Sequence, residues 1–193
     1  MSLLLDTVRG LEYLHSQVPP ILHGGLKGSN VLIDTRTGYP RARLRDFGHR
    51  RIIQQFVEDQ EAMSSYIPPL GNPRWLAFER LKPWKYDIEE EGDIESVHSD
   101  VFELIRTFFE VLTGHPPFFD VTSDRAVLLM TDNGRNPDRP PPSEASPELD
   151  DELWELMQRA WNRDRSQRPP LSEVRGVLES KLAAGCLTET EVA

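Results

Sequence analysis

The sequence has almost no cysteine and no long apolar run. Its single cysteine, Cys186, cannot form an internal disulfide, which fits a reducing compartment. No apolar run approaches the roughly 18 residues that a membrane-spanning helix requires. The first residues also lack the basic start of a secretory signal. We therefore expect a protein of the cytoplasm, with the nucleus as an alternative, that does not engage a membrane.

Basic residues are outnumbered by acidic ones. Lysine and arginine together number 22 against 32 aspartate and glutamate residues, which gives a formal net charge of −10. Sequence-independent binding to nucleic acid or to an anionic membrane depends on clustered Lys and Arg, so both kinds of partner are disfavoured. Many acidic side chains gather within residues 87–95. This pattern indicates a solvated loop, with a docking site as the alternative.

Helical periodicity dominates the apolar pattern. The length of 193 residues and the hydrophobic fraction of 38% predict one packed domain. Apolar residues recur at helical spacing in several segments, which predicts a mainly α fold. The expected helices cover residues 2–16, 99–113, 124–130, about 149–160 and about 171–182. The helix at 99–113 has the broadest apolar face and should lie at the centre, ending at Gly114.

Non-helical segments separate these helices. Short apolar runs at residues 31–33 and 42–44, divided by turn-forming residues, predict a small β-hairpin. Residues 48–74 show no clear period and contain several prolines, so we expect a long irregular loop. Residues from 184 onward are small and polar. We therefore expect a domain over residues 1–183 and a flexible tail over residues 184–193.

Five short motifs, in this order, resemble those of protein kinases. The string HGGLKGSNVLID, from residue 23, resembles the catalytic loop, whose pattern is His-Arg-Asp-Leu, four variable residues and Asn. Asp-Phe-Gly at residues 46–48 resembles the metal-binding triplet. The remaining motifs are the end of the activation segment at 75–79, the start of the central helix at 99–101 and the late arginine motif at 168–169. The context of Trp75 and residues 27–30 is similar to the tyrosine-kinase-like group, whose active members generally modify Ser or Thr.

The resemblance implies the C-terminal lobe of a kinase domain. Such a lobe is a mainly α helical bundle with a small β-hairpin at the cleft. Only 22 residues precede His23, and the first helix uses them. The glycine-rich loop, the strand lysine and its partner glutamate would all lie upstream in the family. We therefore expect the N-terminal β-rich lobe to be absent from this chain.

Four positions match the family's ATP and Mg²⁺ machinery. By resemblance, Asp46 would hold Mg²⁺ and Asn30 would add a second metal contact. Lys27 would offset the charge of the transferred phosphate, and Leu32 would pack beneath the adenine. The residues alone leave simpler interpretations open, because Asp-Phe-Gly often ends a strand in a turn and Asn is a common turn residue. The sequence therefore leaves two expectations, a site that binds ATP and Mg²⁺ and a site that has lost this binding.

The catalytic loop departs from the family at its most important position. Gly25 occupies the place of the catalytic aspartate, which accepts the proton of the substrate hydroxyl. A hydrogen atom cannot replace a carboxylate, and loss of a general base typically costs about 10²- to 10⁴-fold in rate. Gly24 replaces the arginine that often senses activation-loop phosphate, so that control should be absent. Phe78 stands where the family usually has proline, next to Glu79.

Several further positions are expected to hold structure. Glu79 and Arg168 resemble the family's buried ion pair, with two unrelated surface charges as the alternative. Asp100 could cap the central helix, and by resemblance it would also grip the backbone near His23. The resemblance also gives structural roles to His23, Phe47 and Gly48.

Three functions remain open from the sequence. The first is a catalytically impaired pseudokinase or kinase fragment that acts through binding. The second is an active Ser/Thr protein kinase whose N-terminal lobe is missing from this chain. The third is a nucleotide-free scaffold that docks through residues 87–95. The apolar face that an N-terminal lobe would cover predicts pairing with another protein.

Overall fold

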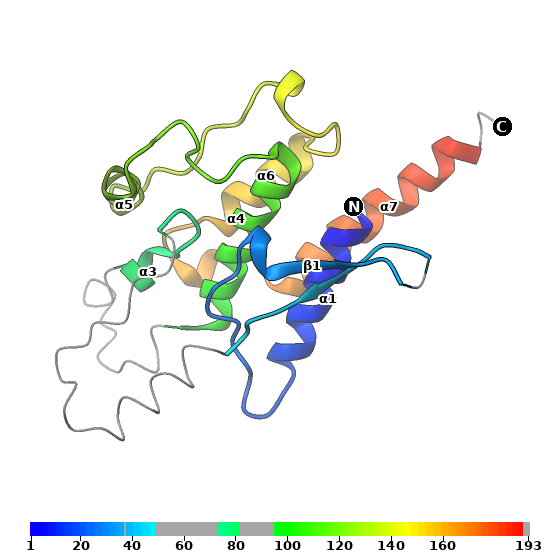
Figure 1. Cartoon of the computed structure of the whole chain (residues 1–193), viewed down its shortest axis with the longest axis horizontal. Helices are drawn as coiled ribbons and strands as arrows, with labels where there is room; N and C mark the ends of the chain where they lie inside the picture. The colour runs from blue at the N-terminus through cyan, green and yellow to red at the C-terminus, as the bar shows by residue number, and fades with distance from the viewer. Residues whose placement is uncertain (37, 49–72, 82–94, 191–193) are drawn as a thin grey trace.

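The computed structural model describes residues 1–36, 38–48, 73–81 and 95–190, and only the backbone of residues 186–190 (Figure 1). Most of the predicted irregular loop at 48–74 lies outside the described residues. The same holds for the acidic stretch at 87–95, of which only Glu95 is described. Both predictions therefore stay predictions.

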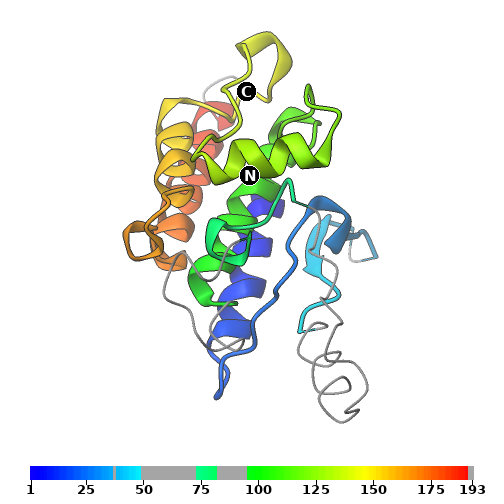
Figure 2. The same cartoon turned by 90° about the vertical axis from the view of Figure 1, so that its left-hand side faces the viewer.

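Helix α4 (Val97–Thr113) runs through the centre of the molecule (Figure 2). It begins two residues before the predicted start, because Ser96 and Ser99 form a reciprocal capping box. Ser99 N donates to Ser96 Oγ at 3.1 Å, and Ser96 N donates to Ser99 Oγ at 2.9 Å. The N-terminal cap of α4 is therefore Ser96. The sequence had suggested Asp100 as the cap, and that prediction was wrong. Gly114 ends the helix in the left-handed conformation at φ 71°, which confirms the predicted stop.

The other long helices surround α4. Helix α1 (Ser2–His15) lies beside α7 (Leu171–Thr190), and α6 (Asp151–Ala160) packs against α4 (Figure 1). Helix α5 (Asp124–Asp132) and the short α3 (Phe78–Leu81) pack against one another. Three 3-10 turns complete the described helical elements: η1 (Gly28–Asn30), η4 (Pro142–Glu144) and η5 (Arg165–Gln167). The mainly α prediction is confirmed.

The predicted hairpin is present. Strands β1 (Val31–Asp34) and β2 (Arg41–Leu44) pair antiparallel, with Val31 opposite Leu44. The strand β2 packs against α1, where Asp6 Oδ2 accepts a hydrogen bond from Ala42 N at 3.2 Å. Leu32 projects to the opposite face, since successive side chains of a strand alternate, and it is 49% exposed. The hairpin thus presents one packed face and one open face.

The C-terminal helix is longer than expected. Helix α7 continues to Thr190, so the backbone is helical beyond residue 184, where we predicted the tail to begin. The alanines at 183 and 184 are strong helix formers and favour this continuation. The motion of residues 184–193 in solution stays a prediction. Within the described residues, no helix combines the length and the apolar character needed to cross a bilayer.

Candidate functional site at residues 23–30 and 46–48

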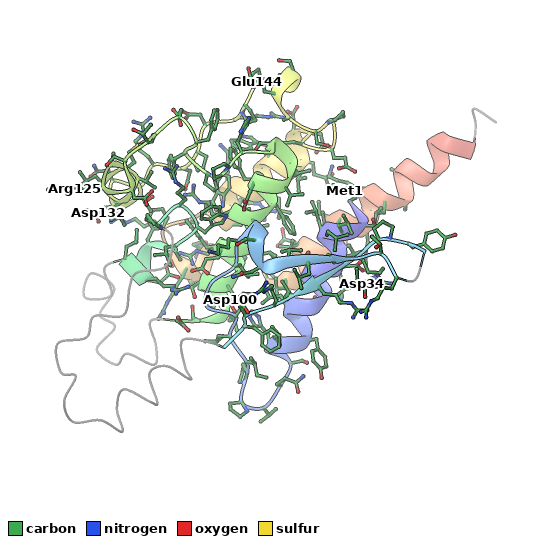
Figure 3. The ribbon with its side chains drawn as sticks, in the orientation of Figure 1. Met1, Asp34, Asp100, Arg125, Asp132 and Glu144 are labelled. Atoms are coloured by element: carbon green, nitrogen blue, oxygen red, sulfur yellow. The ribbon has the colours of Figure 1, made fainter. Side chains whose placement is uncertain are left out.

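A buried carboxylate from α4 holds the start of the loop. Asp100 Oδ2 accepts a hydrogen bond from His23 N at 2.8 Å, and Asp100 Oδ1 accepts one from Gly24 N at 2.9 Å. His15, at the end of α1, places its Nε2 2.8 Å from the same Oδ2. Asp100 is fully buried on α4, in the interior of the molecule (Figure 3). One side chain therefore joins the loop to two helices, as the resemblance implied.

Two further carboxylates of α4 hold the rest of the loop. Glu103 Oε2 accepts a hydrogen bond from Leu26 N at 3.2 Å, and Glu110 Oε2 accepts one from Gly28 N at 2.7 Å. Glu110 Oε2 also accepts a bond from Trp75 Nε1 at 3.0 Å. A Cβ on Gly28 would lie 2.7 Å from the carboxyl carbon of Glu110, so a side chain there would displace this carboxylate. Neither glutamate was among the sequence candidates.

A buried arginine completes the frame beneath the loop. The Arg80 guanidinium donates to Glu103 and, at 3.1 Å, to the carbonyl oxygen of Gly24. It also bonds to Glu95 Oε1 at 3.1 Å. Burial raises the pKa of Glu103 to about 7, against the opposing charge of Arg80. Charged residues inside an otherwise apolar helical stretch are the signal that could have identified Glu103 from the sequence.

Gly25 lies in an intact backbone frame but offers no side chain. Asn30 Nδ2 donates to the carbonyl oxygen of Gly25 at 2.8 Å. A Cβ built on Gly25 would have no atom within 4 Å. A Cβ at position 25 would therefore have room. The role of this position stays a prediction.

The Asp-Phe-Gly turn lies beside this loop. Arg45 N donates to the Asn30 carbonyl oxygen at 3.0 Å, and Asp46 is the residue that follows Arg45. Gly48 N donates to the His23 carbonyl oxygen at 3.3 Å. The structure therefore brings residues 46–48 against residues 23–30, as the resemblance implied.

Asp46 has a cationic neighbour, Arg45, that the motif pattern does not indicate. Asp46 adopts φ 59°, in the left-handed region, and its Oδ2 accepts a hydrogen bond from Arg45 Nε at 3.0 Å. Both side chains are half exposed. Phe47, the next residue, is 44% exposed. The predicted metal ligand is thus accessible, but it already has a positive partner.

The remaining candidates lie at the edge of the loop. The carbonyl oxygen of Lys27 accepts a hydrogen bond from Asn30 N at 2.9 Å, which opens the turn η1. Lys27 is partly exposed. His23 is 2% exposed, and burial lowers its pKa, so its ring is a neutral packed group. The roles of Lys27 and His23 stay predictions.

The expected ion pair is present below the site. Arg168 Nη1 and Nη2 donate to Glu79 Oε1 and Oε2 at 2.7 and 2.8 Å, and both side chains are 0% exposed. Phe78, in the place of the family's proline, begins α3 and packs edge to face on Phe102 at 5.2 Å. Phe78 therefore adds to the core, and the adjacent Glu79 still pairs with Arg168.

The loop that carries Asn30 is held by carboxylates of α4 and lies against the Asp-Phe-Gly turn in a mainly helical body. The family model for the protein kinase domain matches residues 1–177. The chain belongs to the protein kinase family.

Comparison with curated proteins gives kinases from several kingdoms. The chain is 32% identical over 178 residues to the probable serine/threonine-protein kinase roco6 of Dictyostelium discoideum, covering 90% of this chain and 8% of that protein. It is 32% identical over 194 residues to the dual serine/threonine and tyrosine protein kinase of Gallus gallus, covering 99% and 18%. It is 28% identical over 179 residues to the serine/threonine-protein kinase VIK of Arabidopsis thaliana, covering 93% and 37%. The chain spans less than two fifths of the length of these relatives.

Proposed function

We propose that this chain is a catalytically impaired, kinase-like domain that acts through binding. The observation that carries the proposal is Gly25, which leaves open space where the family places its proton acceptor. The backbone around it is held by Asp100 and by the Asn30 amide. The geometry that would position a base is thus retained while the base itself is missing. Such a loss typically costs about 10²- to 10⁴-fold in rate.

We also propose that the described residues form the helical lobe of such a domain, without its β-rich partner lobe. The support is that the described part of the chain contains one two-stranded sheet and otherwise helices and turns. In the family, the partner lobe supplies the glycine-rich loop and the strand lysine. The side of a nucleotide pocket that this lobe supplies would include Leu32.

Protein kinase domains generally use ATP and Mg²⁺, and the donor groups present here fit that cation. Asp46 offers a carboxylate and Asn30 an amide oxygen, which are the hard oxygen ligands that Mg²⁺ prefers. The Asn30 nitrogen is occupied by Gly25, so the amide oxygen is the atom left for a metal. Lys27 would lie beside the phosphates. Arg45 competes with the cation for Asp46, which predicts weak metal binding.

Two other functions each have one observation in their favour. An active Ser/Thr protein kinase is favoured by the names of the relatives, among them two serine/threonine kinases and one dual-specificity kinase. A nucleotide-free scaffold is favoured by the Arg45 guanidinium on Asp46, since a paired carboxylate is a poorer metal ligand. Gly25 counts against the first of these and has no bearing on the second.

The partner proposal rests on the open side of the hairpin and loop. Leu32, Phe47 and Ile21 are large apolar side chains that are between 36% and 49% exposed. Exposed large apolar side chains favour contact with another polypeptide. We propose a protein partner there, in the cytoplasm or, as the alternative, in the nucleus.

Phosphate transfer tests the proposal. The chain and its Asp46→Asn variant are incubated with Mg²⁺, radiolabelled ATP and a mixed protein substrate. Asn keeps the shape of the side chain and removes its charge, and the half-exposed site tolerates the change. We expect equal labelling, at the level of a reaction without protein. Labelling by the parent that disappears in Asp46→Asn would show an active kinase and overturn the proposal.

A further inference from the structure

Arg106, on α4, is a fully buried cation that belongs to none of the contacts described above. Its side chain is 0% exposed. Arg106 Nη2 donates to Asn136 Oδ1 at 2.8 Å, whereas Nε and Nη1 have no hydrogen-bond partner among the residues that the structure describes. Burial lowers the pKa of Arg106, with no contribution from a neighbouring charge of the described chain. A charge in a protein interior normally has a partner of opposite sign, and this guanidinium lacks one there.

The guanidinium lies among three buried aromatic rings. Its Cζ is 5.0 Å from the ring centroid of Phe102, 5.0 Å from that of Phe118 and 4.8 Å from that of Trp161. We call these three rings the aromatic cage. A ring face attracts a cation through its quadrupole but carries no net charge. The cage therefore favours the guanidinium and still leaves its charge without a counterion.

The turn that carries Phe118 is held in a specific conformation. Phe118 adopts φ 57°, in the left-handed region that residues with a Cβ seldom occupy. Arg74 holds this turn, since its Nη1 donates to the carbonyl oxygen of Pro117 at 3.0 Å and its Nη2 donates to that of Val121 at 2.6 Å. An unfavourable backbone conformation persists only where its surroundings enforce it. The ring of Phe118 is thus positioned against Arg106 by the fold.

The unpartnered polar atoms of Arg106 and of the aromatic cage are all hydrogen-bond donors. They are Arg106 Nε, Arg106 Nη1 and Trp161 Nε1. None of these N–H groups accepts a hydrogen bond. A water molecule would accept from them, but it would bring two further hydrogens and no charge. An anion is a pure acceptor and supplies the missing negative charge, so it matches this set of atoms better than water does.

The charge and the full burial of the guanidinium define the class of anion. Arg168 lies over the same Phe102 ring at 5.1 Å, but Glu79 already neutralises it with both carboxylate oxygens. One positive charge is therefore left to balance, and a dianion would leave a buried net negative charge. A site in a close-packed interior admits only a small ion.

We propose that Arg106 and Trp161 bind one small inorganic monoanion, of the size of chloride, in the core between α4 and the end of α6. The ion would join α4 to Trp161, and through Arg106 to Asn136 in the segment after α5. None of these residues belongs to the loop at 23–30 or to the turn at 46–48. The proposal therefore does not depend on phosphate transfer. A ligand that binds only the folded chain stabilises it.

The test compares the melting temperature of the parent chain in sodium chloride and in sodium gluconate at equal ionic strength. Gluconate is a monoanion that is too large for the site, so the comparison holds general charge screening constant. We expect a saturable rise of about 3 to 8 °C in chloride at about 0.2 M relative to gluconate. Equal melting temperatures in the two salts would overturn the site.

Two arginine variants locate the effect. Arg106→Met removes the charge and should abolish the difference between the two salts, and an apolar side chain in place of a buried ion is often tolerated. Arg139→Met is the matched control, because Arg139 also lies over an indole ring, that of Trp154 at 5.9 Å, but is 37% exposed. The control should keep the full chloride shift. A shift in Arg106→Met equal to that of the parent would contradict the assignment to Arg106.

A measurement on the parent chain does not require that a variant folds. Anomalous diffraction from crystals grown in sodium bromide should place a bromide in hydrogen-bond contact with Arg106 Nη1 or Nε and with Trp161 Nε1. Bromide at surface positions alone would be an adventitious ion only, and it would overturn the proposal. A water molecule on Arg106 in that salt would do the same.

Discussion

Arg168 and Glu79, 89 positions apart in the sequence, form a two-pronged ion pair that no solvent reaches. The pair ties α3 to the segment before α7, and Arg168 also donates to the His98 carbonyl oxygen at 2.9 Å. Glu79→Ala would leave the guanidinium buried without its charge partner. We expect a loss of about 3 to 5 kcal/mol in the free energy of unfolding, measured by urea denaturation.

The matched control is the surface pair between Arg9 and Glu179. Arg9 Nη2 lies 3.0 Å from Glu179 Oε1, and the two side chains are 53% and 45% exposed. Arg9→Ala should cost no more than about 1 kcal/mol, because solvent screens exposed charges. Equal unfolding curves for the parent and Glu79→Ala would contradict the account of a buried pair.

Gly24 and Gly25 should respond differently to the same substitution. Gly24 has φ +67°, and a Cβ there would lie 2.7 Å from Glu95 Oε2. Gly24→Ala should therefore destabilise by about 1 to 2 kcal/mol from the left-handed backbone alone. Gly25 has open space for a Cβ, so Gly25→Ala should change the free energy of unfolding by less than about 0.5 kcal/mol. Thermal melts of the two variants give the comparison, and a reversed order would refute the loop geometry.

Glu103 predicts a specific dependence of stability on pH. Burial raises its pKa from the ordinary 4.5 to about 7, so the folded chain keeps a proton that the unfolded chain releases. The contribution of this group is complete below pH 4.5 and is lost as the pH rises through about 7. Glu103→Gln has no proton to lose. The unfolding free energy of the parent minus that of Glu103→Gln should therefore decrease as the pH rises from 4.5 to about 7. Parallel plots of unfolding free energy against pH for the two proteins, from pH 4.5 to 8, would contradict the raised pKa.

The open face of the hairpin predicts that the chain binds a dye specific for exposed apolar surface. Leu32 is 49% exposed on the side of the strand away from α1, and Phe47 is 44% exposed. The parent should bind a dye that fluoresces at apolar surfaces, and Leu32→Gln should reduce that signal without lowering the melting temperature. Tyr13→Gln is the control, since this exposed aromatic lies on α1 outside the hairpin. A parent without dye signal would contradict the proposed protein-binding face.

The helices, the hairpin and the convergence of the motifs could be predicted from the sequence. Helical periodicity located α4 to within two residues, and Gly114 fixed its end. The spacing of apolar residues could not locate the start of α4, because reciprocal hydrogen bonds between Ser96 and Ser99 set that start. The contacts of Glu79 and Asp100 followed from the ordered motifs rather than from any periodicity.

The buried charges beneath the loop could not be predicted in the same way. Arg80 and Glu103 lie 23 positions apart, and nothing in a linear pattern shows that they meet. Arg106 is a similar case, since its guanidinium is fully buried among the rings of Phe102, Phe118 and Trp161 at 4.8 to 5.0 Å. Burial lowers the pKa of Arg106. A charged residue in an apolar helix predicts only that a partner exists, and the fold decides which one.

Residue-resolved amide exchange of the parent chain tests the central claim most directly, namely that carboxylates of α4 hold the loop at residues 23–28 of this kinase-family domain. Asp100, Glu103 and Glu110 accept the amides of residues 23, 24, 26 and 28. We predict that these four amides exchange at least about a hundredfold more slowly than unprotected ones. Exchange of Gly24 and Gly28 at the rate of an open loop would contradict the account.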